Sequence, residues 1–69
     1  MHITYTLKNS GEVLHGFYDE TTRLMRLASG RELDLSADSD RKVAKKLLYN
    51  KVVTMPDLKV VTLAELVKG

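Results

Sequence analysis

The chain has 69 residues, a length that allows one small domain spanning residues 1–69. Its formal net charge is +2 at pH 7. Hydrophobic residues make up 43% and charged residues 29%, the composition of a globular protein. The absence of cysteine excludes disulfides, thiolate metal sites and a cysteine nucleophile. A substrate pocket would take up much of so small a core, so we expect no enzymatic activity and no cofactor.

The N-terminal residues predict a β-hairpin. Ile3, Tyr5 and Leu7 alternate with polar residues, which indicates a half-buried strand. A turn over residues 9–12 then leads to a second strand over residues 13–18. A glycine inside that second strand, Gly16, indicates a bulge or a close approach of another backbone.

The register of this hairpin depends on where the turn closes. Closure at Ser10-Gly11 would pair residues whose numbers sum to about 21, with His15 opposite Thr6 and His2 near Asp19. No histidine pair has metal-ligand spacing, so we expect exposed strand histidines and no metal site. The buried face of the second strand stays open between two sets, Val13/His15/Phe17 and Leu14/Gly16/Tyr18.

Two interpretations fit the next segment. A turn over residues 19–22, a strand over 23–27, a turn over 29–31 and a strand over 32–35 would extend the hairpin into a meander. The alternative is a helix over residues 21–29 that stops at Gly30. We favour the strand, because a helix of about two turns is marginal.

An amphipathic helix is predicted at about residues 37–50. It follows a cluster of helix-starting residues, Ser36–Asp40, and Asn50 is a suitable C-cap. Apolar residues at helical spacing form its core stripe: Val43, Ala44, Leu47 and Leu48.

The opposite side of that helix is basic. Residues 41–51 hold five positive charges and no negative one, whereas the first 36 residues have a net charge of −1. Such a face can bind phosphates or acidic groups, and a tyrosine among the lysines can stack on a base. The candidate binding residues are Arg41, Lys42, Lys45, Lys46 and Tyr49.

The C-terminal part predicts one more strand and a short helix. Residues 52–55 continue as an extended segment, Pro56-Asp57 forms a turn, and residues 58–61 form a strand. Thr62 and Glu65 have the spacing of a capping box at the start of a helix over residues 63–68. Its apolar side would hold Leu63, Leu66 and Val67.

The predicted fold class is α+β. A small antiparallel β-meander of about four strands, able to close into a partly open barrel, precedes one amphipathic helix (about 37–50), a further strand and a short C-terminal helix.

These features favour a cytoplasmic, non-enzymatic protein-binding module such as an adaptor, assembly factor or inhibitor, with no catalytic residues. The N-terminus lacks signal-peptide features, and no stretch approaches the ~20 apolar residues of a membrane span. Size and composition are typical of bacterial or phage accessory proteins. The alternative is a nucleic-acid-binding protein that uses the basic helix 41–51, and assembly as a homodimer stays open.

Overall fold

The computed structural model describes residues 1–68, and the side chains of residues 1–66. Over this range the chain forms six strands and two helices, in the order β1 (His2–Leu7), β2 (Val13–Asp19), β3 (Leu24–Arg26), β4 (Glu32–Asp34), α1 (Asp38–Leu47), β5 (Leu48–Met55), β6 (Lys59–Val61) and α2 (Leu63–Lys68). Neither helix is long and apolar enough within this range to cross a membrane.

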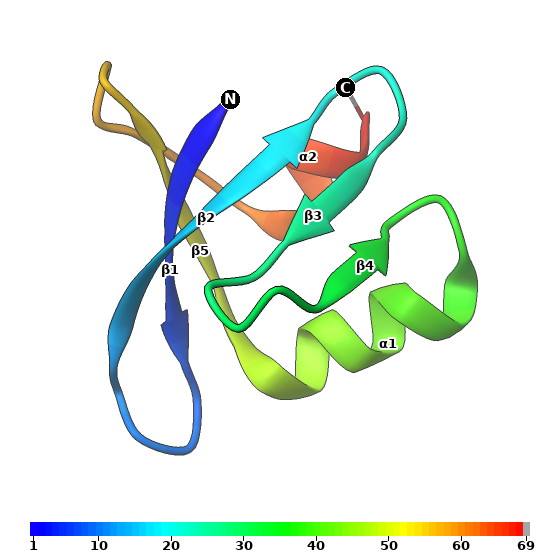
Figure 1. Cartoon of the computed structure of the whole chain (residues 1–69), viewed down its shortest axis with the longest axis horizontal. Helices are drawn as coiled ribbons and strands as arrows, with labels where there is room; N and C mark the ends of the chain where they lie inside the picture. Colours follow the sequence, from blue (N-terminus) through cyan, green and yellow to red (C-terminus); the bar gives the residue numbers. More distant parts are fainter. Residues whose placement is uncertain (69) are drawn as a thin grey trace.

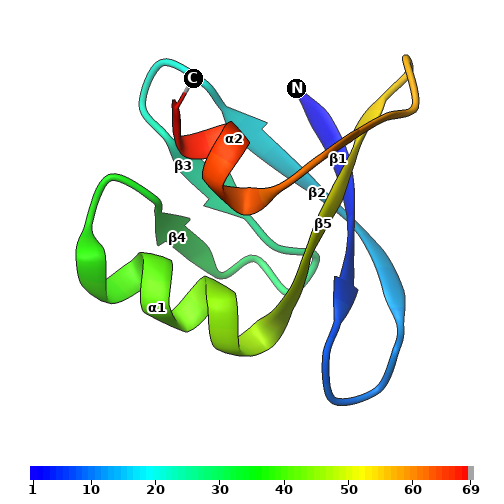
Figure 2. The same cartoon turned by 180° about the vertical axis from the view of Figure 1, so that it is seen from behind.

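All six strands belong to one antiparallel sheet with the order β4-β3-β2-β1-β5-β6. The first four strands form the predicted meander, and α1 carries the chain across to β5, which pairs with the other side of β1 (Figure 1). Both helices lie on the same side of the twisted sheet, which is the near side in Figure 2. The α+β class is confirmed, and the sheet is open, with β4 and β6 as its edges.

The predicted register of the β1–β2 hairpin is wrong by two residues. His15 pairs with Thr4 rather than Thr6, and His2 pairs with Phe17 rather than lying opposite Asp19. The loop is longer than a two-residue turn: the Leu7 N–H donates to the Glu12 carbonyl, and a glycine in the loop has a φ of 72°. A shift of two residues does not move any side chain to the opposite face of the sheet, because side chains alternate between the faces with a period of two.

The second strand buries the set Leu14/Gly16/Tyr18 rather than Val13/His15/Phe17. Of the two predictions for Gly16, a bulge or a close approach of another backbone, the close approach is confirmed. A Cβ at this position would lie 2.7 Å from the Arg26 carbonyl oxygen and 3.0 Å from Cε1 of Tyr5. The hairpin and β3 can therefore come together only around a residue that has no side chain.

The segment after β2 is a strand, as favoured, and the helix over residues 21–29 does not form. The carboxylate of Asp19 accepts hydrogen bonds from the backbone N–H groups of Thr21 and Thr22, which orders the turn. Met25 is then fully buried, while its neighbours Leu24 and Arg26 are exposed.

The first helix is shorter than predicted, ending at Leu47 and not at residue 50. Leu48 is extended (φ −116°, ψ 145°), fully buried and paired with Leu7, and the Lys8 N–H donates to the Leu47 carbonyl. Strand pairing with β1 thus replaces the last helical turn, so residues 48–55 form a full strand. Asn50 is consequently not the C-cap of this helix.

The start of α1 also differs in detail from the predicted cluster of caps. Ala37 occupies the N-cap position, where no side chain caps the helix. Asp40 instead accepts a hydrogen bond of 2.8 Å from the backbone N–H of Asp34, which joins the helix to β4. Both Asp38 and Asp40 lie in the first turn, where negative charge is favourable.

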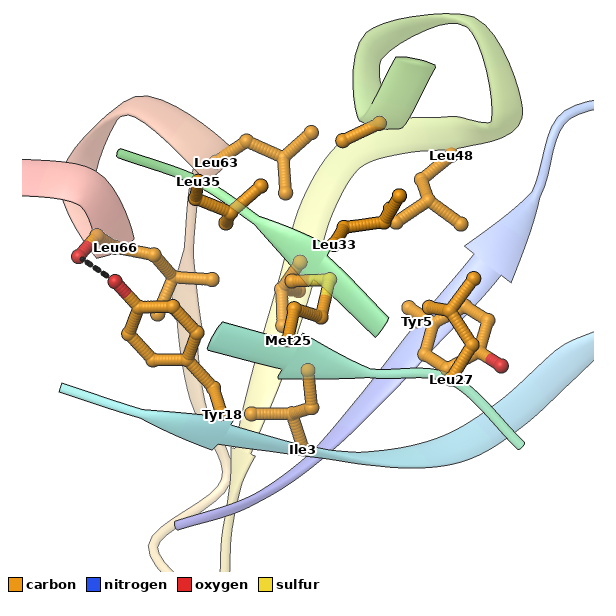
Figure 3. Packing of buried hydrophobic residues seen from close by; sticks show 12 residues of the cluster. Ile3, Tyr5, Tyr18, Met25, Leu27, Leu33, Leu35, Leu48, Leu63 and Leu66 are labelled. Atoms are coloured by element: carbon orange, nitrogen blue, oxygen red, sulfur yellow. Dashed lines mark hydrogen bonds between the residues drawn. The ribbon is translucent and has the colours of Figure 1, made fainter. Parts of the chain in front are cut away.

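The core lies between the inner face of the sheet and the two helices (Figure 3). Two buried tyrosines keep their hydroxyl groups hydrogen-bonded: Tyr18 donates to the Leu66 carbonyl at 2.8 Å, and Tyr5 accepts from the Ala28 N–H at 2.8 Å. The buried cluster contains Ile3, Tyr5, Tyr18, Met25, Leu27, Leu33, Leu35, Ala44, Leu48, Val52, Leu63 and Leu66.

The second helix is fixed at its N-terminus by two side chains. The Thr62 hydroxyl accepts from the Glu65 N–H at 3.1 Å, as the capping-box motif predicts. Asn50 accepts from the Leu63 N–H through its Oδ1 at 3.1 Å, so this residue caps α2 instead of α1. Leu63 and Leu66 face the core as predicted, and the side chain of Val67 lies outside the described residues.

Candidate binding surfaces

The outer face of the sheet is the side away from both helices, and the strand register determines which side chains lie next to each other on it. Phe17 pairs with His2 of β1 and with Arg26 of β3, so these side chains share one face. One register step along, Val53 pairs with Thr4 on one side and with Val60 on the other. We call this surface the outer face. The residues at its centre are Thr4, Val13, His15, Phe17, Val53, Met55 and Val60.

Large apolar side chains are exposed mainly on this outer face. The exposed fractions are 64% for Val13, 43% for Phe17, 36% for Leu24 and 54% for Val60. Leu58, in the β5–β6 turn, and Tyr49, at the start of β5, complete the exposed set among the described residues. An apolar patch that spans several strands is typical of an interaction surface.

Charged side chains flank the centre of the outer face: Arg26 pairs with Phe17, and the exposed Lys51 precedes the buried Val52 in β5, so the alternation of the strand places it on the outer side. Arg26 and Glu32 form an exposed ion pair of 3.3 Å at the end near β4. Next to it, a shallow pocket of about 190 Å³ is lined partly by Phe17 and Leu24. An uncharged centre with a charged rim is the usual arrangement of a protein–protein interface.

The four cationic residues predicted for the basic helix face all lie on α1, but their surroundings differ. Arg41 donates to the Leu35 carbonyl at 3.1 Å and forms an ion pair with Asp38, so its charge is partly neutralised. Lys42 and Lys46 are exposed on α1. Lys45 is also exposed, but it lies beside α2.

The interpretation of Tyr49 as part of the helix face is wrong, because the helix ends before it. This tyrosine is the second residue of β5 and is 48% exposed. It follows the fully buried Leu48, and the alternation of the strand turns it away from the core. The structure therefore keeps the four cationic residues on α1 and separates the aromatic residue from them.

A two-part groove runs between α1 and α2, and we call it the α1–α2 groove. One part, of about 190 Å³, is lined by Leu35, Arg41, Ala44, Lys45, Leu63 and Ala64. The adjoining part, of about 370 Å³, is lined by Lys8, Lys45, Leu48, Asn50, Leu63 and Ala64. Both parts share a lysine and the first turn of α2, and no acidic side chain among residues 1–66 lines either of them.

Lys8 reaches this groove from the end of β1, and the sequence patterns did not identify it. Its ammonium group donates to the Lys45 carbonyl, in the last turn of α1, where the helix dipole favours a positive charge. The contact joins residues 37 positions apart. No local spacing carries a signal for it.

A third cavity, of about 380 Å³, opens at the other end of the molecule between β2, β5, β6 and α2. Its lining includes Glu20, Asp57 and Glu65 together with Lys59. Among residues 1–68, no three His, Cys, Asp or Glu side chains come close enough together to hold a metal ion. This cavity therefore lacks a ligand cluster.

The two histidines lie on the outer face. The His2 ring stands edge-on to Phe17, with ring centroids 5.4 Å apart and planes at 84°, a favourable aromatic geometry. His15 is exposed on β2 opposite Thr4. Within the described residues, neither histidine takes part in an ion pair.

The pKa values of Tyr18 and Asp34 are shifted, and both shifts have structural causes. Burial raises the pKa of the Tyr18 phenol above its ordinary value. Hydrogen bonds from the side chain and backbone of Ser36 lower the pKa of Asp34. Neither group lines the α1–α2 groove.

No family model, no curated protein and no solved structure matches this chain.

Proposed function

We propose that this chain is a cytoplasmic, non-enzymatic protein-binding module whose principal binding surface is the outer face. The observation that carries the proposal is the position of the exposed apolar side chains. Val13, Phe17, Leu24 and Val60 are all placed on this face by strand register, opposite the face that both helices cover. Burying them against another protein would remove apolar surface from water.

The partner we propose is a protein with an uncharged, apolar surface. The centre of the outer face has no Lys, Arg, Asp or Glu, so binding an apolar surface there would bury none of these charges. Charges at the rim, such as the Arg26–Glu32 pair, would help to orient the bound partner but would contribute little to its affinity.

The test is purification of the tagged full chain, with any stoichiometric partner, from cells that contain it. We expect Phe17→Lys and Val60→Lys to abolish the complex, while Lys46→Gln, a change at another exposed position on α1, keeps it. We also expect the complex to persist at high salt, because apolar contacts are not screened. A complex that is lost at high salt or with Lys46→Gln, and kept with Phe17→Lys, would contradict the proposal.

A second candidate function, nucleic-acid binding through α1, is favoured by one observation. Lys42 and Lys46 are exposed on the same helix as Lys45, which lines the α1–α2 groove together with Lys8. Phosphate contacts through these residues would weaken steeply with salt. A titration of single- and double-stranded nucleic acids at low and high salt tests it, and unchanged affinity in the double variant Lys45→Glu/Lys46→Glu would contradict it.

A further inference from the structure

The α1–α2 groove combines an apolar slot with cations beside it. The slot is walled by aliphatic side chains, two from the sheet side and α1 (Leu35 and Ala44) and two from the first turn of α2 (Leu63 and Ala64). Its volume is about 190 Å³. Cavities of roughly 150 Å³ bind a molecule the size of benzene, so the slot accommodates one aliphatic or aromatic side chain.

The cations stand at the adjoining part of the groove. Lys8 uses one of the three N–H bonds of its ammonium group on the Lys45 carbonyl, which leaves two to donate. Asn50 uses its Oδ1 to accept from the Leu63 N–H, so its amide nitrogen is the group that can still act on a ligand. Lys45 lines both parts of the groove.

The groove has a net positive charge. Arg41 is partly neutralised by Asp38, but Lys8 and Lys45 have no acidic counterpart among the lining residues. A ligand that places a carboxylate there would form charge-assisted hydrogen bonds with two ammonium groups. These are the strongest contacts the site can offer.

We infer that the α1–α2 groove is a second binding site, separate from the outer face, for a short acidic peptide segment with an aliphatic side chain next to its carboxylates. The aliphatic side chain enters the slot against Leu63 and Ala64, and the carboxylate binds Lys8 and Lys45. Charge complementarity selects an acidic segment. The aliphatic walls select a peptide over a nucleic acid, because among residues 1–66 no aromatic side chain lines the groove for a base to stack on.

The experiment is an NMR titration of the isotopically labelled full chain with a capped peptide of sequence Glu-Leu-Glu-Glu. We expect shift changes at the backbone amides of Leu63 and Ala64 with millimolar peptide. A peptide with serine in place of the leucine, and a peptide with lysines in place of the glutamates, are expected to bind much more weakly. An absence of shifts at these amides, or equal binding of the serine peptide, would overturn the inference.

Two variants in the same helical turn separate the site from general charge. Lys45→Gln is expected to weaken binding about tenfold, the effect of losing one charge-assisted hydrogen bond. Lys46→Gln removes the same charge from the same last turn of α1 but does not line the groove, so we expect less than about a twofold change. Equal weakening by the two variants would overturn the inference.

A third variant and a competing ligand complete the test. Ala64→Phe changes an exposed residue of the slot and is expected to block the leucine while leaving the fold intact. A short oligothymidylate serves as the nucleic-acid probe under the same conditions. If it perturbs the same amides and binds more tightly than the peptide, the groove is a phosphate site and the inference is wrong.

Discussion

Tyr18 and Phe17 are neighbouring aromatic residues in β2, yet they have opposite environments. Tyr18 is fully buried and donates its hydroxyl hydrogen to the Leu66 carbonyl of α2. Phe17 is on the other side of the strand, where it is 43% exposed and its ring stands edge-on to His2. In so small a chain the two helices cover one face of the sheet, and the apolar side chains of the other face remain available for a partner.

The largest expected effect comes from β3, which places Met25 on the inner face and Leu24 on the outer face. Met25→Ala should lower the free energy of unfolding by about 2–5 kcal/mol, because it leaves a cavity in the core. Leu24→Ala should lower it by less than about 1 kcal/mol. Urea denaturation followed by circular dichroism measures both. Similar losses in the two variants would contradict the assignment of the faces.

The next effect concerns the close approach at Gly16. Gly16→Ala would place a Cβ 2.7 Å from the Arg26 carbonyl oxygen, and should destabilise the fold by roughly 1–3 kcal/mol through the forced displacement. His15→Ala, on the outer face of the same strand, is the control and should change stability by no more than about 0.5 kcal/mol. Thermal denaturation of the two variants would distinguish them, and an unaffected Gly16→Ala protein would contradict the β2–β3 packing.

A smaller effect is expected for the buried phenol. Tyr18→Phe removes its hydrogen bond to the Leu66 carbonyl and should cost about 1–2 kcal/mol of unfolding free energy. Tyr49→Phe changes an exposed phenol and should cost almost nothing, which denaturation at neutral pH can establish.

The same pair of variants gives a pH dependence. The pKa of Tyr18 is raised in the folded chain, so below its ordinary value of 10.0 the phenol is protonated in both the folded and unfolded states. Above that pH the unfolded chain loses the proton first, and the unfolding free energy decreases as pH rises. Tyr18→Phe should remove this part of the alkaline decline. A decline of unchanged steepness would show that the buried phenol does not cause it.

The smallest effect on the free energy of unfolding is expected for Phe17→Thr. The same variant best distinguishes the outer face, which we propose for binding, from the inner face, which forms the core. This change should alter the unfolding free energy by no more than about 0.5–1 kcal/mol, since the residue is 43% exposed and its ring stands edge-on to His2. It should nevertheless reduce binding of a hydrophobic dye to the native chain. Undiminished dye binding would indicate that the outer face is not the apolar surface that solvent probes reach.

Much of the fold follows from local patterns. The alternation at Ile3 and Tyr5 and the Thr62–Glu65 capping box predict β1 and the start of α2. The register of the hairpin does not follow, because the sequence permits closure by a two-residue turn or by a longer loop. The end of α1 does not follow either, since Leu48 continues the helical spacing and only its pairing with Leu7 makes it a strand.

The candidate sites divide in the same way. The helical spacing of residues 41–46 places Arg41, Lys42, Lys45 and Lys46 on one helix, and they are found there. Tyr49 was misplaced because its position depends on the helix end. Lys8 could not be found, since its contact with Lys45 joins distant parts of the chain. For the outer face, the sequence leaves open which side of residues 13–18 is buried, because both sides carry large apolar residues, and only the burial of Tyr18 decides between them.

Photo-crosslinking in cells that contain the protein tests the central claim most directly. A benzophenone amino acid replaces Phe17 at the centre of the outer face or, as the control, Lys42 on the exposed side of α1. We predict that the probe at position 17 forms one defined protein adduct and that the probe at position 42 does not. An adduct with a second copy of this chain counts as such a protein adduct. A defined adduct only from position 42, or none from position 17, would contradict the assignment of the outer face as the binding surface.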